Sequence, residues 1–138
     1  MRVVVDTNVL ISSFFGGNPK KVVDLWKAGD VTLCLSKDIV DEYVEVLQRI
    51  GSDPALIGEL LSLFAGGYHV SFAGKTPSLK IVAGDPDDDK FFECAVALKA
   101  SVIVTGDRAM LKIGNYMGVA VENPQQFLSS RPIQRTSG

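Results

Sequence analysis

Four short runs of β-branched and other apolar residues constrain the fold most strongly, because helix-length segments separate them. The runs lie at residues 3–5, 31–35, 102–105 and 119–121. Continuous apolar runs of this length are typical of strands that are covered on both faces of a parallel sheet. Strands that alternate with helices predict the α/β fold class, with a mainly parallel central sheet flanked by helices.

Capping and turn residues mark the ends of the expected helices. Asn18 with Pro19 opens a helix that ends at Gly29, and Ser36 caps a helix over residues 37–50. Further helices are expected at residues 53–66, at about 88–99, as a single turn near 110, and after 123. Residues 68–72 alternate like a strand, residues 79–82 form a further extended piece, and residues 83–87 form a loop.

The length of 138 residues suits one domain, which we place at residues 1–129. A polar tail at residues 130–138 follows, and we expect it to be disordered. Apolar residues make up 46% of the chain, enough to bury a core without disulfides or a structural metal. The net charge of −2 excludes the global basic field that drives indiscriminate nucleic-acid binding, so any RNA contact must come from a local basic rim.

The cysteines and the histidine exclude several kinds of site. Cys34 and Cys94 lie in apolar stretches, where a free cysteine behaves as a small core residue. We find no signal peptide and no apolar run near the ~20 residues of a membrane span, so we expect a cytoplasmic protein with reduced thiols. His69 is the single histidine, which disfavours histidine-based zinc sites and Ser-His-Asp triads.

Two aspartates stand at the ends of apolar strands. Asp6 follows the run at residues 3–5, and Asp107 follows the run at 102–105. Functional groups of parallel sheets collect beyond the carboxyl ends of the strands. Each aspartate also suits a local role as a cap or turn residue, because aspartate bonds well to free backbone N–H groups. Their pairing at one edge of the sheet favours the functional interpretation.

Further carboxylates lie on the expected helices. Glu42 falls at the border of an apolar helix face, nearer to it than Asp38 or Glu45, although a solvated helix face would suit Asp38, Asp41 and Glu45 just as well. The segment 85–89 carries more acid than a helix N-terminus needs, namely Asp85, Asp87, Asp88 and Asp89. Asp87 is best placed as the cap. Asp88 and Asp89 both flank the apolar stripe of the helix, which consists of Phe92, Ala95 and Val96. Both therefore remain candidates.

The acidic set predicts a metal-dependent reaction. Oxygen ligands without histidine or cysteine partners select hard cations such as Mg²⁺ or Mn²⁺. Carboxylates held close together without a cation raise one another's pKa and destabilise the fold. Divalent ions next to a phosphodiester polarise it and activate water. The pattern therefore favours phosphodiester hydrolysis.

Four segments of the chain resemble the PIN domain, the nuclease fold of VapC-type toxins and of some RNA-processing enzymes. They are VVVDTNVLIS, SKDIVDEYVEVL, DPDDDKFFECAVAL and SVIVTGDRAML, which stand in the family's order. The resemblance as a whole extends from residue 3 to about 128. The resemblance implies a single PIN-like domain and a ribonuclease that leaves a 5′-phosphate and a 3′-hydroxyl. It also implies Asp6, Glu42, Asp89 and Asp107 as catalytic residues that hold one or two metal ions.

The choice of Asp89 follows the family's spacing of eighteen residues between its third and last acids, with Asp88 as the rival. The resemblance further implies Thr7 and Asn8 as neighbours that support Asp6. Asn8 and Thr105 could orient the ligands or the water. Candidates for phosphate contacts are basic residues, for most of which a solvated surface is the simpler role: Lys20, Lys21, Arg49, Arg108 and Lys112.

The segments are most similar to bacterial and archaeal PIN proteins labelled as toxin components. Such proteins pair with a small antitoxin that masks the active site, and they typically form homodimers. The resemblance therefore implies an RNA substrate, an antitoxin partner and a homodimer or higher homo-oligomer.

Two other functions compete with the nuclease. One is a PIN-like RNA-binding protein with negligible catalysis, which the complete acid set disfavours. The other is a phosphatase with Asp6 as nucleophile. Such enzymes usually need a second acid two residues further on, where this chain has Asn8.

Overall fold

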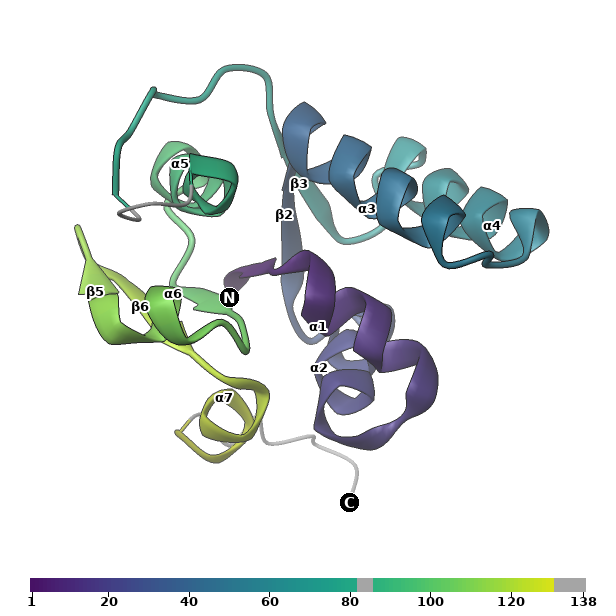
Figure 1. The fold of residues 1–138 in the computed structure, drawn as a ribbon, viewed down its shortest axis with the longest axis horizontal. Coiled ribbons are helices and arrows are strands. Elements are labelled where there is room, and N and C mark those ends of the chain that lie inside the picture. Colours follow the sequence, from purple (N-terminus) through teal and green to yellow (C-terminus); the bar gives the residue numbers. More distant parts are fainter. Residues whose placement is uncertain (82–85, 131–138) are drawn as a thin grey trace.

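The computed structural model describes residues 1–81 and 86–130, which form a six-stranded sheet with helices on both sides (Figure 1). The order of strands is β3-β2-β1-β4-β6-β5, and every neighbouring pair is parallel except β5 with β6. The predicted α/β class with a mainly parallel sheet is therefore confirmed. The strands are β1 (Arg2–Val5), β2 (Thr32–Ser36), β3 (Val70–Ala73), β4 (Val102–Val104), β5 (Asn115–Tyr116) and β6 (Val119–Glu122).

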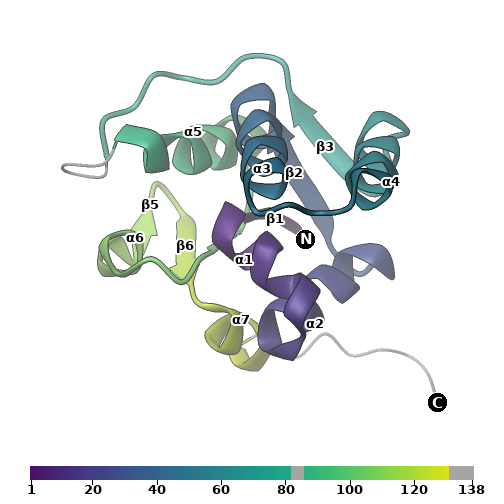
Figure 2. The same cartoon turned by 45° about the vertical axis from the view of Figure 1, so that its right-hand side comes forward.

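Helices cover both faces of the sheet, with α5 on one side and α2 and α7 on the other (Figures 1 and 2). The order of strands requires this, because right-handed crossovers that run in opposite directions along a sheet place their helices on opposite faces. The helices are α1 (Thr7–Ser12), α2 (Gly17–Lys27), α3 (Lys37–Arg49), α4 (Pro54–Ala65), α5 (Asp89–Leu98), α6 (Arg108–Ile113) and α7 (Pro124–Ser130), with 3₁₀ turns η1 (Ser13–Phe15) and η2 (Pro86–Asp88).

Most of the predicted elements are present, and their differences have local causes. Ser36 caps α3 by accepting a hydrogen bond from the Ile39 N–H at 3.4 Å, as expected. The predicted cap of α2 at Asn18 is wrong, because Gly16, with φ +94°, occupies the N-cap position. The helix begins at Gly17, two residues before the predicted first helical residue Pro19. Helix α1 and the short strand β5 were not predicted, and residues 79–81 form no strand. Val82, Asp85 and the tail from residue 131 lie outside the described residues.

The centre of the sheet carries the core. Residues 3–5 and 102–105, which the sequence predicts to be buried, are at most 3% exposed. Cys34 and Cys94 are free and fully buried, and burial raises the pKa of their thiols to about 11 and about 12. Both are therefore core residues, as predicted. Across residues 1–81 and 86–130, no helix is long and apolar enough to cross a membrane.

Candidate active site

The carboxyl ends of β1 and β4 are level with each other. Val5 is the register partner of Val104, and the Asp6 N–H donates to the Val104 carbonyl at 3.0 Å. Asp6 and Thr105, the next residue on each strand, therefore stand side by side. The Thr105 hydroxyl donates to Asp6 Oδ2 at 2.6 Å and accepts the Asp107 N–H at 3.0 Å. One buried hydroxyl thus joins the two aspartates that the sequence predicts at the carboxyl ends of these strands. Asp6, Thr105 and Asp107 are called the edge below.

Asp6 is nearly enclosed, with 4% of its surface exposed. Burial raises the pKa of its carboxyl, and the negative charges of Glu42 and Asp107 raise it further. The hydrogen bonds from Thr105 and from the Asn8 N–H act in the opposite direction. The ionised carboxylate is therefore an unfavourable group in the folded chain, because it is poorly solvated and faces like charges. Asp6 is also the N-cap of α1, so the local role considered from the sequence is present too.

Thr105→Val is expected to destabilise the fold by about 1–3 kcal/mol, because it leaves buried polar atoms of two partners without their bond. Valine has the shape of threonine, so packing is preserved while the bonds to Asp6 and Asp107 are lost. Urea unfolding measures the change, and Thr105→Ser, which keeps the hydroxyl, should recover most of it. Equal stability of the valine variant and the wild type would mean that this hydroxyl does not hold the edge together.

Helix α3 is fastened to the same edge by two consecutive residues. The buried Tyr43 hydroxyl donates to the Val5 carbonyl, at the end of β1. Thr7 is 3% exposed, and its hydroxyl donates to Glu42 Oε2. Glu42 therefore faces the start of α1, close enough to Asp6 for its charge to affect the Asp6 pKa. Thr7 therefore contacts Glu42, whereas Asn8, an exposed residue, donates its backbone N–H to Asp6 Oδ1 at 3.4 Å.

Lys90, which sequence reasoning missed, contacts the other oxygen of Glu42. Its ammonium donates to Glu42 Oε1 at 2.6 Å, from the first turn of α5. Both side chains are largely covered, with 16% of Lys90 and 26% of Glu42 exposed. The position of Lys90 in the sequence could have indicated such a contact. A lysine in the first turn of a helix is disfavoured by the helix dipole, and a nearby carboxylate offsets that effect.

Asp89 lies on a different side of α5. It is 6% exposed, and its Oδ1 accepts the Ile81 N–H at 3.2 Å. One turn later, Glu93 Oε2 accepts the Leu79 N–H at 2.8 Å. These two carboxylates hold the extended segment 79–81 against the helix. Asp89, the residue that the family spacing selects, therefore has a structural contact with segment 79–81.

Asp88 continues the buried face of α5. Residues three, four and seven positions apart share a helix face, and Phe91, Phe92 and Ala95 stand at those distances after Asp88. All three are at most 1% exposed. The backbone of Asp88 is helical, with φ −80° and ψ −17°, so the spacing applies to it. Asp88 thus extends the face that packs on the sheet, whereas Asp89 shares its face with Glu93.

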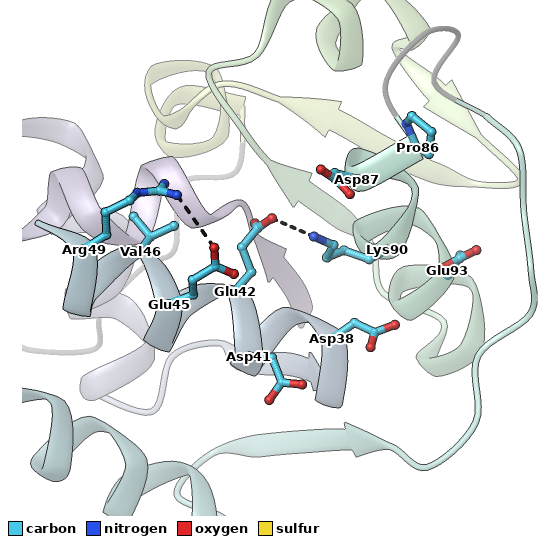
Figure 3. Close-up of a pocket in the computed structure, with 10 residues that line it drawn as sticks. All are labelled: Asp38, Asp41, Glu42, Glu45, Val46, Arg49, Pro86, Asp87, Lys90 and Glu93. Atoms are coloured by element: carbon cyan, nitrogen blue, oxygen red, sulfur yellow. Dashed lines mark hydrogen bonds and ion pairs between the residues drawn. The ribbon is translucent and has the colours of Figure 1, made fainter.

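An acidic cleft of about 560 Å³ opens between α3 and the start of α5 (Figure 3). Glu42 is the one predicted catalytic residue that lines it. Figure 3 shows Lys90 reaching across from α5 to Glu42, and Arg49 turned toward Glu45. The lining consists of Asp38, Asp41, Glu42, Glu45, Val46, Arg49, Pro86, Asp87, Lys90 and Glu93.

The predicted phosphate contacts fall in different places. Arg108 and Lys112 lie exposed on α6, which begins at the N-cap Asp107, so they flank the edge. Lys20 is paired with Asp24 at 2.8 Å on α2, next to the exposed Lys21. Arg49 approaches Glu45 at 3.7 Å, in the last turn of α3.

The donor chemistry of the edge fits a hard divalent cation, because Asp6, Glu42 and Asp107 offer carboxylate oxygens. The raised pKa of Asp6 is a second sign, since a cation would relieve the repulsion among these charges. The four acids expected as ligands are not assembled, however. Among the described residues, no three ligating side chains stand close enough to hold an ion, with Glu42 bound to Lys90 and Asp89 turned to segment 79–81.

Comparison with known proteins gives one result for the family. A family model described as PIN domain matches residues 2–109, which include the edge, α3 and α5. No curated protein matches the chain.

Proposed function

The chain belongs to the PIN-domain family, whose members are generally nucleases, and from this membership we propose that it is a metal-dependent ribonuclease. The reaction is hydrolysis of RNA phosphodiester bonds with Mg²⁺ or Mn²⁺ as cofactor. The observation that carries the proposal is the edge of the sheet. There the Thr105 hydroxyl links the buried Asp6 to Asp107, and the charge of Glu42 raises the pKa of Asp6.

Asp6, Asp107 and Glu42 are the residues that would hold the ion, because each offers carboxylate oxygens. Their side chains stand too far apart in this structure and would have to converge on the ion. When bound, a divalent cation polarises the phosphodiester and activates water. Thr105 fixes the orientation of the Asp6 carboxylate by donating to one of its oxygens. We expect Arg108 and Lys112, which are exposed on α6 beside the edge, to bind RNA phosphates. The products expected from the family resemblance are a 5′-phosphate and a 3′-hydroxyl.

Asp88 takes precedence over Asp89 as the fourth acid of the proposed site. Asp88 extends the sheet-facing side of α5, in line with the buried Phe91 and Phe92. The carboxylate of Asp89 accepts the Ile81 N–H on a different side of the helix. The sequence ranked these two residues in the opposite order.

The purified chain is expected to cut single-stranded RNA when Mn²⁺ or Mg²⁺ is added and to stop when the ion is chelated. The assay follows end-labelled RNA on a gel, with restoration by excess metal as the control for damage by the chelator. Cleavage that continues in excess chelator would contradict the metal-dependent mechanism. RNA binding without cleavage at any metal concentration would favour the alternative of a PIN-like RNA-binding protein.

The narrower role is that of the toxin in a type II toxin–antitoxin pair, with a homodimer as the assembled form. Its support is the resemblance of the four segments to toxin components. A short reading frame next to this gene, encoding a protein with a DNA-binding start that inhibits cleavage, is the expected partner. Sedimentation showing only monomer at micromolar concentrations would contradict the homodimer.

A further inference from the structure

The ion pair of Lys90 with Glu42 differs from the other ion pairs of the described residues. Its partners are 16% and 26% exposed, whereas the side chains in the other three pairs are 44–82% exposed. Exposed pairs contribute little, because water screens them and the long side chains lose freedom. A largely covered pair is screened less, so the contact at 2.6 Å is a strong local restraint on Glu42.

The surroundings make Lys90 the main counter-ion of the cleft. Six carboxylates line the cleft, on α3 and at the start of α5. Arg49 is the other cation in the lining, and it approaches Glu45 rather than Glu42 (Figure 3). Lys90 also stands in the first turn of α5, where the helix dipole disfavours a positive charge. The nearby acids offset that unfavourable position.

Both oxygens of Glu42 already have partners. Thr7 donates to Oε2 and Lys90 donates to Oε1. The Thr7 hydroxyl is neutral and is compatible with a cation nearby, whereas the Lys90 ammonium would repel it. A cation that takes Glu42 as a ligand is therefore expected to displace Lys90 rather than Thr7.

We propose that Lys90 is a built-in counter-ion of Glu42, which a divalent cation displaces, so that this exchange sets the affinity of the site for metal. The inference rests on the proposed function, because it takes Glu42 as a metal ligand. Lys90 acts through Glu42 and is thus a positioning residue. In the metal-free protein it holds Glu42 in place.

Lys90→Met is expected to bind Mn²⁺ about tenfold more tightly than the wild type, because a positive charge next to the site is gone. Titration of the full chain with Mn²⁺, following the free ion by electron paramagnetic resonance, measures the affinity without any RNA. The matched control is Lys37→Met. It removes an equal charge from another pair, Lys37 with Asp41 at 2.7 Å on α3, but those side chains are 82% and 60% exposed. The control should change the affinity less than about twofold.

A double substitution tests whether Lys90 acts through Glu42. In a Glu42→Gln background, Lys90→Met should no longer tighten Mn²⁺ binding. A gain that persists there, or unchanged or weaker binding by Lys90→Met itself, would overturn the inference. If Lys90→Met folds poorly, Lys90→Gln replaces it, and thermal unfolding without metal checks both variants.

The result is separable from that of the RNA assay. Tighter Mn²⁺ binding by Lys90→Met without any RNA cleavage would remove the nuclease and leave the inference intact. Cleavage that needs metal, together with an affinity that Lys90→Met does not change, would remove the inference alone. Failure of every variant to bind Mn²⁺ would overturn both.

Discussion

Replacing Asp6 with asparagine is expected to abolish RNA cleavage while the metal-free protein stays as stable as the wild type or becomes more stable. The loss of activity should exceed the ~100-fold that marks the upper range for losing an outer partner of a metal ligand. Stability behaves differently, because the ionised Asp6 carboxylate is buried and faces Glu42 and Asp107. Asparagine keeps the shape and an acceptor oxygen but carries no charge.

The raised pKa of Asp6 determines how the change in stability depends on pH. The pKa of Asp6 is raised in the folded chain above its ordinary value of 3.8, mainly by burial. A raised carboxyl pKa means that folding favours the protonated form, so the unfavourable contribution is present at neutral pH and disappears as the pH falls below 3.8. Any gain in stability from Asp6→Asn should therefore be largest near neutral pH and shrink in acid. Urea unfolding of both proteins across this pH range measures it.

Asp53→Asn is the matched control for this substitution. Asp53 also caps a helix and accepts the N–H two residues further on, from Ala55 at 2.9 Å, but it is exposed and distant in sequence from the edge. Its replacement should leave cleavage unchanged. Gross unfolding of Asp6→Asn at neutral pH would instead mean that Asp6 serves mainly as the cap of α1. Full activity of that variant would contradict its role in the site.

The sequence was sufficient for the fold where its patterns are long. The apolar runs correctly located β1 and β4, and Ser36 and Asp53 correctly located the starts of α3 and α4. Helix α1 was missed because its six residues are too few to show a helical period, and the N-cap at Asp6 was considered only as an alternative to a site. Strand β5 has two residues and pairs only with β6, so no pattern could show it.

For the candidate site, the sequence predicted which strand ends meet but not which side chains touch. The parallel sheet brings Asp6, Thr105 and Asp107 together, as the strand pattern implied. The bond from Thr7 to Glu42 and the pair of Lys90 with Glu42 depend on how α1, α3 and α5 pack against one another. Such contacts join residues 35 and 48 positions apart, which no local pattern reports.

The ranking of Asp88 and Asp89 depended on one residue of the apolar stripe in α5. The sequence placed the stripe at Phe92, Ala95 and Val96, which Asp88 and Asp89 flank equally. In the structure Phe91 is 1% exposed and Val96 is not fully buried, so the buried face is rotated toward Phe91. This rotation puts the part-buried Asp88 in line with Phe91 and Phe92, whereas Asp89, which is 6% exposed, contacts segment 79–81 instead.

Asp88→Asn is therefore expected to lower turnover more than about 100-fold, whereas Asp89→Asn should lower it less than about tenfold. Asparagine at position 89 still has an oxygen that can accept the Ile81 N–H, so this variant removes the charge and preserves the contact. Single-turnover cleavage at saturating Mn²⁺ measures both, and Mn²⁺ titration shows whether the slow variant has lost affinity for the ion.

Asp89→Ala completes the test, because it removes the acceptor as well as the charge. It should destabilise the chain by about 1–3 kcal/mol, since the Ile81 N–H loses its partner, while the turnover of the folded fraction changes little. A larger loss of turnover in Asp89→Asn than in Asp88→Asn would reverse this assignment. The carboxylate of Asp89 would then have to leave segment 79–81 to reach Asp6, and Ile81 would exchange its amide proton faster when metal is bound.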